Sequence, residues 1–156
     1  MDYMNEALKE AKKAYIQGEV PIGAVIVKDD IIIARAFNMK ETLNLATAHA
    51  EILAINKASE FLKSWRLNGC EMYVTVEPCA MCASAIAHAR ISRLHIGTFN
   101  RDMGACGTIF NILDYDIFNT TVDIKWCYND KCSNIITQFF EERRKEKILN
   151  KKIGEV

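Results

Sequence analysis

The sequence predicts an α/β protein of three layers (α-β-α), in which helices cover both faces of a mixed sheet of about five strands. Apolar residues recur with a helical period in some segments and with a period of two in others, in the order α-β-β-α-β-α-β-β-α. Residues 70–99 read as a strand, a helix and a strand, the unit that joins parallel strands through a right-handed crossover.

The first half of the chain supplies a helix, a hairpin and a second helix. Asp2 can cap a helix that ends at Gly18. Residues 21–28 and 31–38 are rich in β-branched residues and are separated by two aspartates, which predicts an antiparallel hairpin. After a polar stretch, residues 48–63 have helical spacing. The expected apolar positions of the two helices are Met4, Leu8, Ala11, Tyr15 and Ile52, Ile55, Phe61, Leu62.

The second half alternates strands with helices. Residues 70–77 form an alternating strand that ends at a proline, where a helix of small residues begins over 79–90. Residues 91–99 and 120–126 predict two more strands, and a helix follows from about 130 to 150. The expected apolar stripe of this last helix is Ile135, Ile136, Phe139 and Phe140.

Length and composition bound the class of protein. The chain has 156 residues, of which 50% are hydrophobic, and this fits a single domain over residues 1–156. The sequence has no apolar run long enough for a membrane span, and its charged, helix-patterned start is unlike a signal peptide. We therefore expect a cytoplasmic protein without a membrane partner, in which the six cysteines are mostly reduced.

The charge is balanced overall but not along the chain. Basic and acidic residues number 20 each, so no global basic field indicates a nucleic-acid binder. Residues 141–152, "EERRKEKILNKK", carry six basic and three acidic side chains. A solvated helix end is the common meaning of such a run, and contact with RNA is the alternative.

The stretch "VEPCAMC" contains two cysteines, Cys79 and Cys82, at a spacing that allows a disulfide, a structural zinc or half of a catalytic metal site. Their positions at a helix start let both thiolates meet one ion. The segment "HAE" adds His49 as a third ligand. No further residue has a ligand-like spacing, so we expect one zinc per chain with water as the fourth ligand.

Glu51, two residues after His49, is the candidate proton carrier. A glutamate in a first helical turn is most often a favourable partner of the helix dipole. Beside an open zinc position it can instead take a proton from water and return it to a substrate nitrogen. The two side chains would point about 200° apart on a regular helix, so their convergence requires an irregular helix start or a Glu51 that reaches back.

The pair H-x-E and P-C-x-x-C is a signature of zinc-dependent nucleobase deaminases. From "GEVPIGAVIV" through "AFN", "TAHAE", "SWRLNGCEMYVTVEPCAMC" and "FFEERRK", nearly the whole chain resembles the bacterial tRNA-specific adenosine deaminases. The resemblance implies a cytidine-deaminase-like fold, a homodimer, and hydrolytic conversion of the wobble adenosine of a tRNA anticodon to inosine. It also implies that His49, Cys79 and Cys82 bind zinc and that Glu51 relays the proton.

The resemblance further implies the substrate contacts. Asn38 matches an asparagine that bonds the flipped base, although an asparagine at a strand end is usually a turn former. Ala48 would offer a backbone contact, and Pro78 would shape the pocket wall. Asn100 stands where an aspartate often faces the ribose, so we expect weaker discrimination against DNA. At the C-terminal helix, the expected contacts to the anticodon stem-loop are Phe140, Arg143 and Arg144.

Two other functions share parts of this pattern. A deaminase of free guanine, cytosine or a nucleoside would have the same zinc ligands, but the basic tail and the extent of the resemblance argue against it. A non-catalytic, zinc-stabilised RNA-binding module would leave Glu51 without a role and the zinc without a fourth protein ligand. Hydrolysis of this kind requires zinc and no organic cofactor.

Overall fold

A computed structural model of the protein describes residues 1–154 and contains a five-stranded sheet with strand order β2-β1-β3-β4-β5. Strand β1 is antiparallel to both β2 and β3, whereas β3, β4 and β5 run parallel. The strands are β1 (Gly23–Lys28), β2 (Ile31–Phe37), β3 (Glu71–Val76), β4 (Arg93–Thr98) and β5 (Asp123–Trp126). The mixed sheet predicted from the sequence is therefore confirmed.

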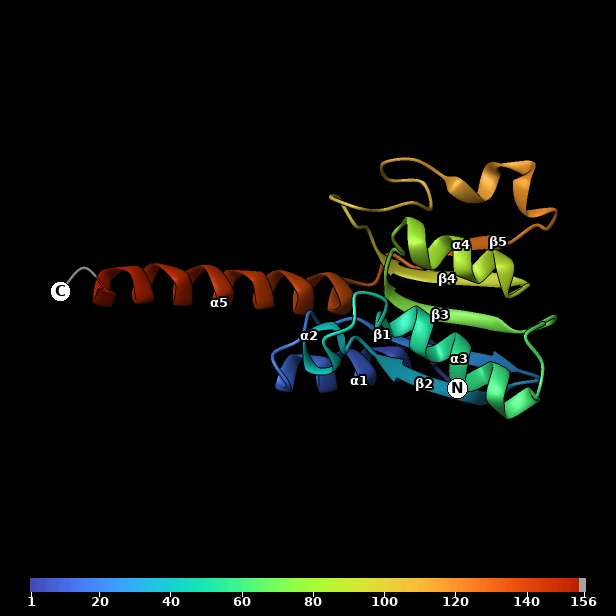
Figure 1. The fold of residues 1–156 in the computed structure, drawn as a ribbon, viewed down its shortest axis with the longest axis horizontal. Helices are drawn as coiled ribbons and strands as arrows, with labels where there is room; N and C mark the ends of the chain where they lie inside the picture. The colour runs from blue at the N-terminus through green and yellow to red at the C-terminus, as the bar shows by residue number, and fades with distance from the viewer. Residues whose placement is uncertain (155–156) are drawn as a thin grey trace.

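Helices cover both faces of the sheet, as predicted. They are α1 (Tyr3–Ile16), α2 (Lys40–Leu43), α3 (Ala50–Leu62), α4 (Ala80–His88) and α5 (Asp130–Gly154). Helices α1 and α5 pack on one face, and α3 and α4 pack on the other. Figure 1 shows the distal part of α5 extending well beyond the sheet, so that only the start of this helix contacts the rest of the molecule.

Local sequence signals explain the first elements. The Asp2 carboxylate accepts a hydrogen bond from the Asn5 amide, 3.0 Å away, and so caps α1 as predicted. Asp29 and Asp30 both adopt positive φ angles, 49° and 61°, which matches the right-handed twist of a two-residue hairpin. Helix α1 then packs very close to β1, because a Cβ atom at Gly23 would lie 2.1 Å from the Ala7 carbonyl oxygen.

The predicted apolar face of α3 is confirmed only in part. Ile55 and Leu62 pack against the core as partly buried side chains, whereas Phe61 is 64% exposed. The fully buried residues of the helix are Ala50, Glu51, Ala54 and Ala58. Alanine side chains allow the helix to approach the strands closely, so small residues decided which side faces inward rather than the large apolar ones.

Three features were not predicted. The polar stretch before α3 contains the short helix α2, and the long connection between β4 and β5 contains two 3₁₀ turns, Ile112–Asp114 and Asp116–Phe118. Cys70, Cys106 and Cys132 are buried free thiols, whereas Cys127 is exposed. In the part of the chain that the structure describes, no helix combines the length and apolar character needed to cross a membrane.

Candidate active site

A cavity of about 750 Å³ lies at the carboxyl ends of the parallel strands. The connections that follow β3, β4 and β5 all reach it, and so do the α1–β1 connection, the β2–α2 connection and the segment before α3. Loops at this edge of a parallel sheet are free of the sheet hydrogen bonding, so ligand-binding groups commonly gather there. The N-termini of α3 and α4 also point into the cavity, and their dipoles favour anionic groups.

His49 and Cys79 line this cavity, and the buried Cys82 lies beside them. Their potential ligand atoms all lie within 4.8 Å of one another. His49 and Cys79 are the N-cap residues of α3 and α4, with extended ψ angles of 152° and 174°, and neither side chain caps its own helix. Both side chains are therefore free to turn toward a common point, and Cys82 joins them from the first turn of α4.

The distances fit a tetrahedral metal ion. His49 Nδ1 lies 3.7 Å from Cys79 Sγ and 3.5 Å from Cys82 Sγ. Zinc with bonds of about 2.3 Å to sulfur and about 2.0–2.1 Å to nitrogen would hold these atoms about 3.5 Å apart at the tetrahedral angle. Two thiolates and an imidazole are also a donor set that zinc prefers. The residues present can hold a zinc ion through three protein ligands.

The pKa values of the two cysteine thiols are shifted in opposite directions. A hydrogen bond from Cys82 lowers the pKa of Cys79 to about 4, although partial burial opposes the shift. The same hydrogen bond and burial raise the pKa of Cys82. One thiolate is thus available at neutral pH before any ion arrives, and a bound cation would favour ionisation of the second.

Glu51 lies beside these ligands and is only 3% exposed. Within residues 1–154, its Oε2 is the one buried side-chain nitrogen or oxygen without a hydrogen-bond partner. Burial raises the pKa of Glu51 to about 7. Because His49 precedes the helix in an extended conformation, the two side chains converge despite their spacing. A buried, unpaired carboxylate oxygen requires a polar partner from outside the chain.

Of the three residues expected around the base, Asn38 lines the cavity, whereas Ala48 and Pro78 do not. Asn38 lines the cavity, is buried, and donates from Nδ2 to the Val20 carbonyl at 3.3 Å. Ala48 and Pro78 are buried outside the cavity lining. The Ala48 carbonyl accepts from the Met39 amide, and the Pro78 carbonyl accepts from the Ala105 amide. The expected backbone contact of Ala48 with the base and the expected role of Pro78 in the pocket wall stay predictions.

Asn100 lines the cavity, but its side chain also organises its own loop. Its Oδ1 accepts from the amides of Asp102 and Met103, and its Nδ2 donates to the Glu77 carbonyl. The expected contact between Asn100 and a ribose stays a prediction. The hydrogen bonds show a structural role that the sequence did not predict.

Glu77 is a site residue that the sequence analysis missed. It is 1% exposed, and its carboxylate accepts from the amides of Asn100, Cys106 and Thr108 at 3.0–3.1 Å. It thereby ties the β4–β5 loop to the segment that carries Cys79. A glutamate at the end of a buried strand was the available signal, because such a charge requires several hydrogen bonds.

Helix α5 presents only some of its predicted contacts to the cavity. Phe140 and Arg144 line it, whereas Phe139 is buried against the body of the protein, which confirms that one of the two phenylalanines packs on the core. Arg143 points elsewhere: it donates to the Gly18 carbonyl at 2.5 Å and lies over the Phe139 ring. Phe139 sets the rotation of the helix, so Arg143 stabilises the α1–α5 contact. The substrate contact of Arg143 stays a prediction.

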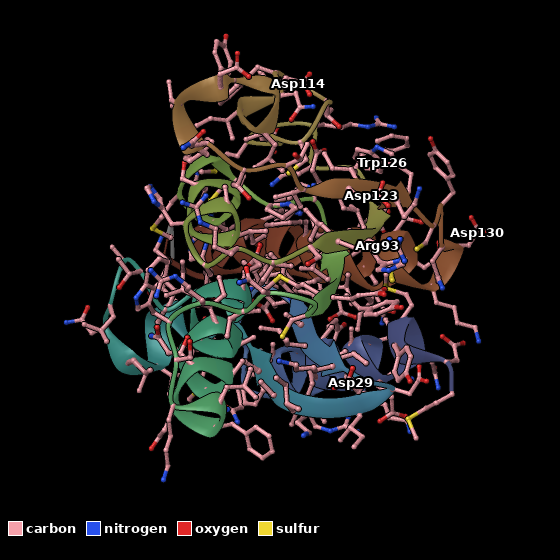
Figure 2. The ribbon with its side chains drawn as sticks, turned by 90° about the vertical axis from the view of Figure 1, so that its right-hand side faces the viewer. Asp29, Arg93, Asp114, Asp123, Trp126 and Asp130 are labelled. Carbon is pink, nitrogen blue, oxygen red and sulfur yellow. The ribbon has the colours of Figure 1, made fainter. Side chains whose placement is uncertain are left out.

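The other two histidines, His88 and His95, lie outside the cavity lining and make contacts within the fold. His95 Nε2 lies 2.7 Å from Glu71 Oε2, and its ring stacks on Tyr73 with centroids 4.0 Å apart. His88 is exposed at the end of α4 and meets the Phe118 ring edge to face. Figure 2 shows that Arg93 and Asp123, which form an ion pair near His95, lie on the same side of the sheet.

The arrangement of the sheet and of these side chains is that of a cytidine-deaminase-like hydrolase, and the protein is a deaminase. A sequence profile of the MafB19-like deaminase family matches residues 1–144. The tRNA-specific adenosine deaminase of Bacillus subtilis (strain 168) is 44% identical over 155 residues, which cover 98% of this chain and 96% of that protein. The chain belongs to the MafB19-like deaminase family and, within it, to the tRNA-specific adenosine deaminases.

Two solved structures place the fold among deaminases of different substrates. One comes from a study of A-to-I editing by tRNA:A34 deaminases at the wobble position of transfer RNA. It matches with a TM-score of 0.82 and 41% identity, covering 85% of this chain and 97% of its own. The other is the X-ray structure of guanine deaminase from Bacillus subtilis, with a TM-score of 0.61 and 39% identity over 64% of each chain.

Proposed function

We propose that this protein hydrolyses the wobble adenosine of a tRNA anticodon to inosine, with zinc held by His49, Cys79 and Cys82. The observation that carries the proposal is the unpaired Oε2 of buried Glu51 beside the three ligand atoms. When bound, zinc supplies a Lewis acid that lowers the pKa of water to near 7. Water adds to the six-position carbon of adenine, and the amino group leaves as ammonia.

The chain's own residues hold the base and move the proton. Glu51 takes a proton from the attacking water at Oε2 and returns it to the departing nitrogen, because this oxygen has no hydrogen-bond partner. The other buried carboxylate of the cavity, Glu77, already accepts hydrogen bonds from the amides of Asn100, Cys106 and Thr108. Asn38 borders the cavity next to His49 and can orient the base through its amide. Burial of Glu51 keeps bulk water away from this proton transfer.

The size of the cavity favours RNA over a free base. The cavity reaches from the ligand group to Arg144 on α5, and its volume of about 750 Å³ is several times that of one nucleobase. A free-base deaminase has no need for a cation at that distance from the reacting atom. The arginine instead suits a phosphate of a neighbouring nucleotide.

One comparison tests the proposal. The zinc-loaded protein is incubated with an anticodon stem-loop that carries a wobble adenosine, and separately with free adenosine, guanine and cytidine. We expect inosine in the stem-loop and little product from the free compounds. Turnover of guanine or cytidine with an unchanged stem-loop would assign the protein to the deaminases of free bases or nucleosides. No product from any substrate would favour an RNA-binding role without catalysis.

We further propose that residues 1–156 act as one deaminase domain with a basic C-terminal helix, that the protein is a homodimer, and that it acts in the cytoplasm, where tRNA is available. The exposed apolar side chains of Leu45 and Phe61, on and before α3, support an association between copies. Sedimentation of the purified protein tests the dimer: a monomer at micromolar concentration would exclude it.

A further inference from the structure

Three aromatic rings pack together at the rim of the cavity. The Phe99 ring centroid lies 5.1 Å from that of Trp126 and 5.7 Å from that of Tyr128, and the Trp126 and Tyr128 centroids are 6.1 Å apart. Phe99 is 47% exposed and Tyr128 is 65% exposed. Both line the same cavity as Glu51. We call Phe99, Trp126 and Tyr128 the aromatic cluster.

The cluster rests on the body of the protein through Trp126. The indole is partly buried and packs against the main apolar core, next to Gly107 of the β4–β5 loop. Figure 2 shows Trp126 on β5 and, further to the right, Asp130 at the start of α5. Phe99 and Tyr128 therefore lie on a fixed support, and their exposed faces are held rather than free to collapse.

The backbone at Tyr128 is strained in a way that presents its ring. Tyr128 has a φ angle of 48°, a left-handed conformation that is unusual for a bulky residue. The amides on both sides of it are anchored, since Cys127 donates to the Ile96 carbonyl and Asn129 donates to the Gly97 carbonyl, each at 2.8 Å. The neighbouring hydrogen bonds thus maintain a conformation that Tyr128 would not adopt by preference.

We propose that the aromatic cluster is a stacking platform for a nucleobase next to the target adenosine, and this inference rests on the proposed function. An adenosine that enters the cavity must leave its stack, so its neighbours in the anticodon loop also lose stacking partners. Exposed aromatic rings replace those partners for any base, because every base has a flat π-face. Arg101, two residues after Phe99, lines the same cavity and can meet the phosphate of that nucleotide.

The test measures how tightly the wild type and three variants bind three RNAs. Phe99→Leu keeps an apolar side chain but removes the ring, and Phe99→Tyr restores a ring. Phe110→Leu is the matched control, because Phe110 is a similarly exposed phenylalanine of the β4–β5 loop that does not line the cavity. The RNAs are an anticodon stem-loop and two versions of it that lack the base immediately 5′ or 3′ of the target adenosine.

We expect Phe99→Leu to weaken binding of the intact stem-loop by about 5- to 100-fold, the range for one lost stacked base. Phe99→Tyr and Phe110→Leu should bind it as the wild type does. Removing one of the two neighbouring bases should weaken the wild type to a similar extent and should weaken Phe99→Leu no further, because the two changes remove one interaction. KM should rise more than kcat falls.

Three outcomes would overturn the platform while leaving the proposed function intact. In the first, all variants bind the stem-loop with equal affinity and deaminate it. The second is a Phe99→Leu loss that is the same on intact RNA and on both RNAs that lack a base. A change in the sedimentation of Phe99→Leu would assign the rings to a contact between copies and would also overturn it. If the wild type does not deaminate the stem-loop, the proposed function itself fails.

Discussion

Residues two positions apart in the segment "HAE" reach the same point because the backbone changes conformation between them. His49 precedes α3 in an extended conformation, whereas Glu51 lies in the first helical turn. On a continuous helix the two side chains would diverge by about 200°. The helix boundary at His49 therefore lets a metal ligand and a buried carboxylate face one cavity.

Glu51→Gln should abolish deamination while zinc binding and the fold remain. The amide has nearly the same volume as the carboxylate but cannot take up and return a proton. Loss of one acid-base group typically costs about 10² to 10⁴ in rate, and we expect at least the upper end because Glu51 is proposed for more than one proton step. Single-turnover rates on the stem-loop, with zinc content measured in parallel, check this.

The matched control for this change is Glu60→Gln, since Glu60 is an exposed glutamate of the same helix. It should leave rate, zinc content and melting temperature unchanged. Turnover of Glu51→Gln within a few fold of the wild type would remove Glu51 from the proton transfer.

Among the elements, α2 shows how a buried charge positions a segment at the edge of the cavity. Glu19 is 1% exposed, and its carboxylate accepts from the amides of Thr42, at 2.6 Å, and Glu41. Both amides belong to the start of a helix, where backbone donors lack partners within the helix. Glu19 thereby fixes α2 and the neighbouring Lys40, which lines the cavity.

Glu19→Gln should destabilise the protein near neutral pH by about 1.5–3 kcal/mol, the usual value of a hydrogen bond to a charged group. Burial opposes ionisation of Glu19, but the hydrogen bonds from Thr42 and Glu41 outweigh it and lower its pKa below 4.5. Because the pKa of Glu19 is lower in the folded than in the unfolded protein, its ionised carboxylate stabilises the fold at pH values above the unfolded-state pKa of 4.5. This stabilisation is lost as pH falls through the folded-state pKa. The difference in melting temperature between variant and wild type should thus shrink in acid; a constant difference would contradict it.

Helix α5 offers adjacent arginines with separate roles, so each can serve as the control of the other. Arg144→Ala should weaken stem-loop binding and reduce its salt dependence by about one phosphate contact, because Arg144 lines the cavity. Arg143→Ala should instead lower the melting temperature and leave binding nearly unchanged, because Arg143 bonds Gly18. Binding titrations at several salt concentrations, beside thermal melts, measure both effects. Equal effects of the two substitutions would contradict these roles.

For the whole molecule, a bound metal would join segments that are distant along the chain. His49 precedes α3 and the cysteines begin α4, and the two helices lie side by side on one face of the sheet. An ion that binds only the folded state stabilises it by mass action. The site is therefore expected to serve both the chemistry and the stability of this face.

Removal of zinc with a chelator should abolish deamination and lower the melting temperature by about 5–10 °C, the shift expected when a ligand at about 100 times its Kd is withdrawn. Cys82→Ala should have no metal, whereas Cys127→Ala, at an exposed cysteine, should keep one zinc per chain. Elemental analysis and thermal melts with and without chelator test both statements. A chelated protein that deaminates at the original rate would exclude a catalytic zinc.

The sequence by itself predicted the order of the main helices and strands, the mixed sheet, and the gathering of His49, Cys79 and Cys82. These features depend on local periodicity and on short spacings, which a helix or strand converts directly into geometry. The same holds for the caps at Asp2 and for the hairpin turn at Asp29 and Asp30, where one or two residues decide the conformation.

Only the tertiary structure decided features that depend on how the elements pack. The rotation of α5, set by Phe139, sends Arg144 into the cavity and Arg143 away from it, although the two are neighbours in sequence. The inner side of α3 is formed by alanines because close approach to the sheet outweighed the burial of Phe61. Glu77 and the aromatic cluster acquire their roles only when separate strands and loops meet, because contacts between distant segments have no periodicity in the sequence.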